Sequence, residues 1–257
     1  MTLRVVALFI VLPALISGYA QTSGKPAQAK TQAEYNDYNT AYAIGSGPAM
    51  EKAANEFAAK YPDSALREYL YSKAMHNYQN ENNPVKMLAM GEKVLALDAH
   101  NAIALVLTAT VLSDGMGDND ADRTQKIEEI KANANNALKF VDEFTPPPNV
   151  TSEQIASYKS TLQSMAHSAL GIMELKSGED AEAEKDLVIA AKINEPQSDP
   201  YIWYHLALAQ DHQKKYKDAL ASVEEALKHV SANPELEKLA SGERERLLKL
   251  TQSPFAK

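Results

Sequence analysis

The sequence predicts an all-α protein, built as a solenoid of antiparallel helix pairs with a C-terminal capping helix. Alanine is abundant and runs of β-branched residues are few, which is a composition typical of helices. Apolar residues recur at every third or fourth position, and no segment shows the two-residue alternation of a confident strand. Turn signals interrupt this pattern at short intervals, so the predicted helices are short and numerous.

Several predicted helices begin with a capping residue. An Asn or Asp oxygen accepts a hydrogen bond from a free backbone N–H, and a proline directly after it has no N–H to lose. This pair of residues occurs at Asn83-Pro84, Asp199-Pro200 and Asn233-Pro234. Capping-box spacing, in which two side chains satisfy backbone donors reciprocally, joins Thr151 to Gln154 and Asp122 to Gln125.

Residues 200–233 contain the clearest helix pair. Small residues let two antiparallel helices approach closely, and large residues fill the gaps beside them. The small residues are Ala207, Ala219 and Ala226, and the large ones are Trp203, Tyr216 and Val223. At these spacings the segment resembles a tetratricopeptide repeat (TPR), whose period is about 34 residues. The resemblance implies a right-handed α-solenoid, and related helical-hairpin repeats are the alternative.

The resemblance extends over residues 31–233. A second copy, at residues 164–197, has Leu170, Gly171, Ala183 and Ala190 at the same offsets, and its first helix is expected to begin near Thr151. The earlier copies are weaker, and the connection at residues 113–120 is longer than the short turn of the family. The predicted pairs span residues 31–64, 68–101, 102–145, 151–197 and 200–233.

Residues 234–257 are predicted to form the capping helix and a tail. A stack of repeats needs such a helix because its last repeat would otherwise expose an apolar face. We expect four leucines of this helix to face inward: Leu236, Leu239, Leu247 and Leu250.

Residues 1–20 have the features of a signal peptide. Arg4 supplies the positive start, and Val5–Ile16 is an apolar run shorter than the about 20 residues that a transmembrane helix needs. Small residues at Gly18 and Ala20 predict cleavage after Ala20. Residues 21–30 would then form a flexible leader of an exported protein, periplasmic or secreted, with no stable membrane span. An uncleaved membrane anchor is the alternative.

The composition excludes several kinds of site. The chain has no cysteine, which excludes disulfides, thiolate metal sites and a catalytic thiol. A formal charge of −8 argues against a nucleic-acid partner, because phosphate binding needs a basic face. The sequence has no phosphate-binding loop, dinucleotide fingerprint or G-x-S-x-G elbow. We therefore expect a protein that is not an enzyme and that has no cofactor and no bound metal.

Acidic residues in the sequence indicate two alternative functions. Paired carboxylates such as Glu128-Glu129 and Glu224-Glu225 would suit a helical hydrolase, although on amphipathic helices such pairs usually form a solvated face.

The second alternative is a calcium-dependent structural module. The Asp118–Asp122 loop has an aspartate at every second position, and Glu129 follows at position 12 of the calcium-loop spacing. Arg123 occupies the position at which that loop needs glycine, so a solvated loop that caps the next helix is the simpler interpretation.

The TPR resemblance implies a concave groove, lined by the first helix of each pair, that holds an extended peptide or a partner's helix. The matching positions are rich in tyrosine, which offers apolar area and a hydrogen-bonding tip at low entropic cost. They include Tyr35, Tyr42, Tyr69, His76, Tyr201, Tyr204 and Asp211, together with Ile103, Val106, Met165, Ser168 and Ile172. Packing between repeats is the alternative role of the tyrosines. The lysines and arginines of the family's carboxylate-clamp subtype are missing, so we expect no such clamp.

These features together predict a non-catalytic scaffold or adaptor in the bacterial cell envelope. Its expected partner is another protein or a peptide, and self-association is a further possibility. The prediction follows from the repeat pattern and from the lack of a catalytic motif, so it depends in part on family resemblance.

Overall fold

A computed structural model describes residues 27–143, 150–193, 199–230 and 233–252. No β-strand occurs in these ranges, which confirms the all-α prediction for the described part of the chain. None of its helices combines the length and the apolarity needed to cross a bilayer. The signal-peptide prediction and the predicted cleavage after Ala20 lie outside the described residues, as does the tail after Gln252.

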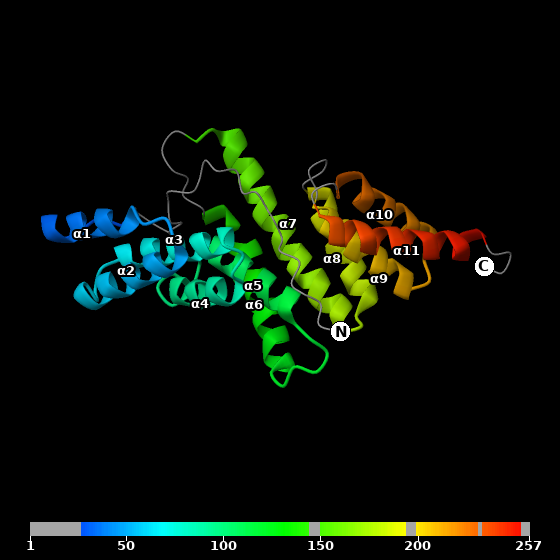
Figure 1. Ribbon diagram of the computed structural model, residues 1–257, viewed down its shortest axis with the longest axis horizontal. Coiled ribbons are helices and arrows are strands. Elements are labelled where there is room, and N and C mark those ends of the chain that lie inside the picture. Colours follow the sequence, from blue (N-terminus) through cyan, green and yellow to red (C-terminus); the bar gives the residue numbers. More distant parts are fainter. Residues whose placement is uncertain (1–26, 144–149, 194–198, 231–232, 253–257) are drawn as a thin grey trace. The chain divides into compact units, whose positions relative to one another are not determined.

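Eleven α-helices and one short 3₁₀ helix make up the described structure (Figure 1). Their bounds are α1 Gln32–Tyr42, α2 Gly47–Lys60, α3 Leu66–Asn80, α4 Pro84–Leu95, α5 Ala102–Gly115, α6 Arg123–Phe140, η2 Val141–Glu143, α7 Ser152–Lys176, α8 Asp180–Ile193, α9 Pro200–His212, α10 Tyr216–His229 and α11 Pro234–Gln252.

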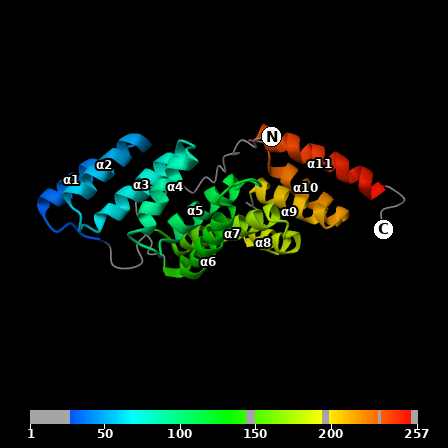
Figure 2. The same cartoon turned by 90° about the horizontal axis from the view of Figure 1, so that it is seen from below.

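The chain divides into two compact units. We call residues 27–111 and 132–162 the N-terminal unit, and residues 112–131 and 163–252 the C-terminal unit. In the N-terminal unit, α1 to α4 lie side by side in both views, and each packs on the next (Figures 1 and 2). In the C-terminal unit, α8 packs on α9, α9 on α10, and α10 on α11. Consecutive helices thus form packed pairs, consistent with the predicted α-solenoid.

The predicted caps explain where several helices begin. Asn83, Asp199 and Asn233 each accept a backbone N–H from the first turn of α4, α9 and α11, at 2.8 to 3.2 Å. Thr151 and Gln154 form both hydrogen bonds of the capping box that starts α7. Asp122 differs, because its carboxylate lies 3.0 Å from the Nζ of Lys126 in α6 and forms an ion pair with it.

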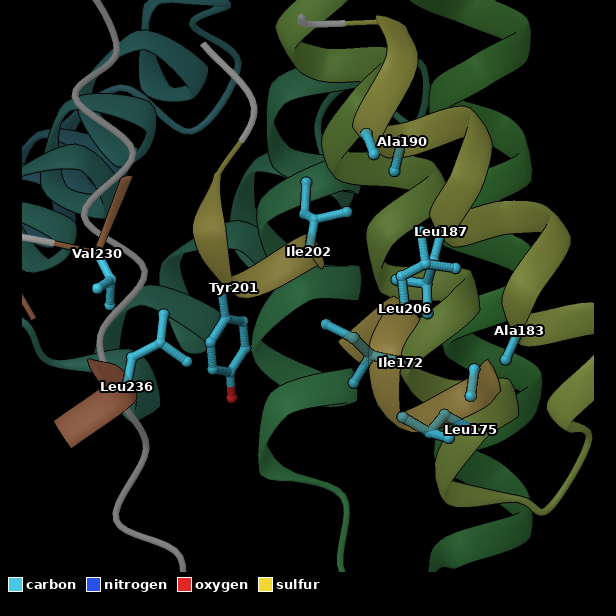
Figure 3. Packing of buried hydrophobic residues seen from close by; sticks show 12 residues of the cluster. Ile172, Leu175, Ala183, Leu187, Ala190, Tyr201, Ile202, Leu206, Val230 and Leu236 are labelled. Atoms are coloured by element: carbon cyan, nitrogen blue, oxygen red, sulfur yellow. The ribbon is translucent and has the colours of Figure 1, made fainter. Parts of the chain in front are cut away.

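An apolar core joins α7, α8 and α9 in the C-terminal unit. Figure 3 shows Ile172, Leu187 and Leu206 meeting between these helices, and each of them is at most 2% exposed. Gly171 permits this contact, because a Cβ at that position would lie 2.6 Å from Leu187 Cγ. Close packing of this kind makes the pair of helices sensitive to the volume of each side chain.

Helix α11 covers α10 with one apolar stripe. Leu236, Ala240 and Leu247 are buried, and the last two pack with Ala207 and Val223. Leu239 is 41% exposed, so the expectation that it faces inward is wrong. The buried residues are four and seven positions apart, so they lie on one face of the helix. Leu239 comes three positions after Leu236 and lies at the edge of that face.

Candidate functional site

A cluster of tyrosines on α1 and α3 forms the most exposed part of the predicted binding face. Tyr35 is 52% exposed, while Tyr42 and Tyr69 are half-buried. Tyr38 lies with them, because its ring centroid is 5.4 Å from that of Tyr42. Burial, followed by the neighbouring Tyr42 and Tyr69, raises the pKa of Tyr38. We call these four residues the tyrosine surface. Tyr38 is not among the residues predicted from the sequence, although its spacing from Tyr42 is one helical turn.

A non-helical segment of the chain already contacts the tyrosine surface. The backbone N–H of Ala27 donates a hydrogen bond to the Tyr69 hydroxyl at 3.2 Å. The Lys30 ammonium donates to the backbone carbonyl of Asp63 at 3.0 Å. The described end of the predicted flexible leader therefore lies against α3 and the turn before it, and Tyr69 binds main chain from a segment without secondary structure.

Two ionisable side chains, Lys73 and Glu68, lie near the tyrosine surface. Lys73 Nζ lies 4.4 Å from the centroid of the Tyr42 ring, a cation–π geometry. His76 is half-buried, with Nδ1 3.2 Å from Gln79 Oε1, and burial lowers its pKa. His76 is therefore neutral at physiological pH and adds hydrogen-bonding capacity without charge.

The predicted binding residues on α9 have structural contacts instead. Tyr201 is 9% exposed and belongs to the core of the C-terminal unit, beside Leu236 (Figure 3). Tyr204 packs against the same core and against the cluster beneath α11. Asp211 forms an ion pair with Arg246 of α11. For these three residues the structure favours the packing alternative.

Other predicted groove positions are also buried. On α5 and α7, five of these side chains are at most 7% exposed: Ile103, Val106, Met165, Ser168 and Ile172. Most of the predicted packing residues are buried: Ala183, Ala190, Ala207, Ala219 and Ala226 fully, Gly171 as well, and Leu170 at 7% exposure. The other two, Trp203 and Tyr216, are half-buried against the apolar clusters.

The loop proposed for calcium holds basic side chains in the place of a metal ion. Lys126 Nζ lies 2.7 Å from Asp120 Oδ2 and 3.0 Å from Asp122 Oδ1. Arg123 donates to the Gly117 carbonyl at 2.7 Å and to the Lys176 carbonyl. The described residues contain no group of three or more acidic or histidine side chains arranged for a metal. Basic side chains thus pair with the aspartates of the loop, and Arg123 joins the loop to the end of α7.

The carboxylate pairs proposed for a hydrolase lie on solvated helix faces. Glu128 and Glu224 are exposed, and Glu224 pairs with Arg244 at 3.3 Å. Glu174 on α7 lies near Asp186 on α8, a proximity that the sequence did not suggest, and burial followed by the charge of Asp186 raises the pKa of Glu174 to about 7. Glu174 is 9% exposed, so its carboxyl group offers little surface to a substrate.

A polar pocket of about 470 Å³ lies between α2, α3 and α4. Glu51 Oε2 accepts a hydrogen bond from the Tyr78 hydroxyl at 2.5 Å and pairs with Lys86 at 3.0 Å. Burial and the contact with Glu51 raise the pKa of Tyr78 to about 12, so the phenol remains a donor at physiological pH. The three residues are far apart in sequence, and no local pattern predicts their contact.

The structure is similar to that of a thermophilic TPR protein from Thermus thermophilus, at 16% sequence identity and a TM-score of 0.44, over 82% of this chain and 98% of that one. No protein-family model matches the sequence. No curated protein matches it either. The packed helix pairs described above define the class: an all-α protein of consecutive helical hairpins.

Proposed function

We propose that the protein is a non-catalytic scaffold that binds an extended segment of another protein through the tyrosine surface. The hydrogen bond from Ala27 N–H to the Tyr69 hydroxyl is the observation that supports it most directly. In this contact the surface accepts main chain without secondary structure, and an extended partner peptide offers the same donors. Helical-hairpin proteins commonly present such surfaces to partner proteins, which supports the proposal at the level of the fold.

The chemistry of the surface fits recognition of an apolar or neutral segment. Tyr35 offers an exposed ring, and the half-buried Tyr42 and Tyr69 are held in place by their neighbours. Aromatic rings with few freely rotating bonds lose little entropy on binding, so they are frequent among residues that dominate binding energy. We further propose that the protein acts in the bacterial cell envelope, which the signal-like sequence of residues 1–20 supports.

A pull-down from envelope extract tests the proposal. The mature chain, from Gln21 onward, is the bait, beside a Tyr35→Ala/Tyr69→Phe variant and a Val85→Ser control. Val85 is 76% exposed on α4 and is not part of the tyrosine surface. We expect a partner to be enriched by the wild type and the control and reduced at least tenfold with the double variant, the effect of about 1.4 kcal/mol. No enrichment by any bait would contradict the scaffold function, and equal recovery by all three would exclude the tyrosine surface.

A further inference from the structure

The segment of residues 27–30, which precedes α1, has no helix or strand and lies against the start of α3. Besides the hydrogen bonds from Ala27 to Tyr69 and from the Lys30 ammonium to the Asp63 carbonyl, the Lys30 backbone N–H donates to Glu34 Oε2 at 2.6 Å. Three hydrogen bonds thus hold a short segment to α1, to α3 and to the turn before α3. One of them ends on Tyr69, so the segment occupies an acceptor of the tyrosine surface.

The groups that accept these hydrogen bonds are held in place by their own contacts. Asp63 lies in the turn between α2 and α3, and the next residue, Ser64, is 3% exposed. The Ser64 hydroxyl accepts the Leu66 N–H at 3.1 Å, and the Ser64 carbonyl accepts Arg67 Nε at 2.8 Å. Glu34 is also 3% exposed. Because the acceptors are preorganised, the cost of binding is mainly the ordering of the bound segment.

The donors of the segment follow a simple pattern. Ala27 and Lys30 are three residues apart, and groups at this spacing point to the same side of an extended polyproline-II chain. An extended chain can therefore offer both backbone N–H groups to one surface. Lys30 then adds its ammonium group, which reaches the Asp63 carbonyl at 3.0 Å. The pattern is a backbone donor, two intervening residues, and a basic residue that donates twice.

The charge of the receiving groups suits the basic end of this pattern. Lys30 donates its backbone N–H to the carboxylate of Glu34 and its ammonium group to the carbonyl of Asp63, which is itself an acidic residue. A cation close to a poorly exposed carboxylate is favoured, and an acidic side chain at the same place would be repelled. The surface therefore favours a lysine or arginine at the position of Lys30.

We infer that residues 27–30 are an internal ligand of the tyrosine surface, which a partner's segment has to displace. This inference rests on the proposed function of that surface. A competing segment has to replace the same contacts. The partner that fits is thus an extended apolar or neutral segment with a basic residue three positions after the N–H that reaches Tyr69.

Attachment to the same chain gives the internal ligand an advantage over a free segment. A segment joined by a short link to its site acts at an effective concentration of the order of mM. The apparent affinity of a partner then falls in proportion to the fraction of the surface that is free. Tyr35 is 52% exposed with residues 27–30 in place, so a longer partner segment can cover this ring and offset the disadvantage.

Binding of a free peptide tests the inference. The probe is acetyl-Ala-Gln-Ala-Lys-Thr-amide, the sequence of residues 27–31, and the readout is the chemical shifts of the α1 and α3 amides. The chain from Gln21 onward is compared with its Ala27→Pro/Lys30→Ala variant, which lacks one backbone donor and the ammonium group of the internal ligand. We expect the double variant to bind the peptide about threefold or more tightly than the wild type, because its surface is free.

Three comparisons control this measurement. Lys52→Ala removes an exposed lysine of α2, whose ion pair with Glu56 is 3.8 Å long, and this variant should bind the peptide as the wild type does. A peptide with alanine in place of lysine should bind the double variant about threefold or more weakly than the original peptide. Adding Tyr69→Phe to the double variant should also weaken binding of the original peptide, because the acceptor for the first N–H is lost.

Equal affinity of the wild type and the double variant for the peptide would overturn the inference, and so would a lack of binding to both. Equal binding of the two peptides would overturn it as well. The pull-down separates these results from the proposed function, because a partner lost with the Tyr35→Ala/Tyr69→Phe variant supports the tyrosine surface even if residues 27–30 do not compete for it.

Discussion

Gly171 and Gly242 show how differently one residue type can act in two helices. A Cβ at Gly171 would lie 2.6 Å from Leu187 Cγ, whereas a Cβ at Gly242 would meet nothing within 4 Å. Glycine costs about 0.5–1 kcal/mol in a helix interior relative to alanine. That cost at Gly171 is offset by the close approach of α7 and α8, while at Gly242 nothing in the described structure offsets it.

Substituting each glycine with alanine should therefore change stability in opposite directions. Gly171→Ala should lower the free energy of unfolding by about 1–2 kcal/mol, because overpacking costs about 1–3 kcal/mol and the gain in helix propensity offsets part of it. Gly242→Ala should raise that free energy by about 0.5–1 kcal/mol. Urea denaturation of both variants measures the difference, and a stabilised Gly171→Ala would contradict the close packing of α7 on α8.

Two helices, α2 and α8, each have a glutamate just after their first turn that contacts the next hairpin. Glu51 of α2 accepts from Tyr78 of α3 and pairs with Lys86 of α4. Glu184 of α8 accepts from Gln213 at 3.0 Å and pairs with Lys215 at 2.5 Å, both between α9 and α10. Glu51 thus connects α2 to both helices of the next pair, and Glu184 connects α8 to the turn of the next pair, so these contacts stabilise the succession of hairpins.

Tyr78→Phe tests this contact in the N-terminal unit. The variant removes the donor at 2.5 Å from Glu51 and leaves the buried ring in place. Hydrogen bonds to charged groups contribute about 1.5–3 kcal/mol, and Lys86 still pairs with Glu51, so we expect a loss of about 1–2 kcal/mol. Tyr35→Phe, at an exposed tyrosine, should change the free energy of unfolding by less than about 0.5 kcal/mol. Equal effects of the two variants would show that the Glu51 contact adds nothing.

The capping helix provides a second test at the scale of elements. Leu247 is fully buried and Leu239 is 41% exposed on the same helix. Leu247→Ala should cost about 2–5 kcal/mol through lost burial and a residual cavity, whereas Leu239→Ala should be nearly neutral. Thermal melting followed by circular dichroism compares them. A similar drop in Tm for both would mean that α11 does not pack through the stripe described here.

At the scale of the whole molecule, the described chain is a succession of helical hairpins in two compact units. Its acidic balance and lack of cysteine suit a protein that avoids nucleic acid and stray oxidation, and the proposed envelope location agrees with both. The right-handed turn of the solenoid and its concave groove stay predictions of the TPR resemblance.

Export can be tested on the intact protein. A preprotein expressed in a bacterial host should be recovered from the periplasmic fraction with Gln21 as its first residue, because signal peptidase reads the small residues Gly18 and Ala20. Intact mass and N-terminal sequencing check this. Recovery of a chain that begins at Met1 in the membrane fraction would favour the anchor interpretation instead.

The sequence by itself determined the helices and several of their first residues. Apolar spacing and capping chemistry are local properties, so Asn83, Thr151 and Asn233 marked helix starts without knowledge of the fold. The lack of cysteine in the sequence also excluded thiol chemistry. The periodicity did not separate a buried tyrosine from an exposed one, because Tyr35 and Tyr201 occupy similar positions on first helices.

Only the tertiary structure decided which of the predicted binding positions are exposed and available to a partner. Helix α11 and the neighbouring core surround Tyr201 and engage Asp211, whereas Tyr35 on α1 remains exposed. The contact between His167 and Asp186 likewise depends on α7 meeting α8. The physical reason is that burial and the pairing of charges depend on what packs from elsewhere in the chain, while helix formation depends mostly on neighbours in sequence.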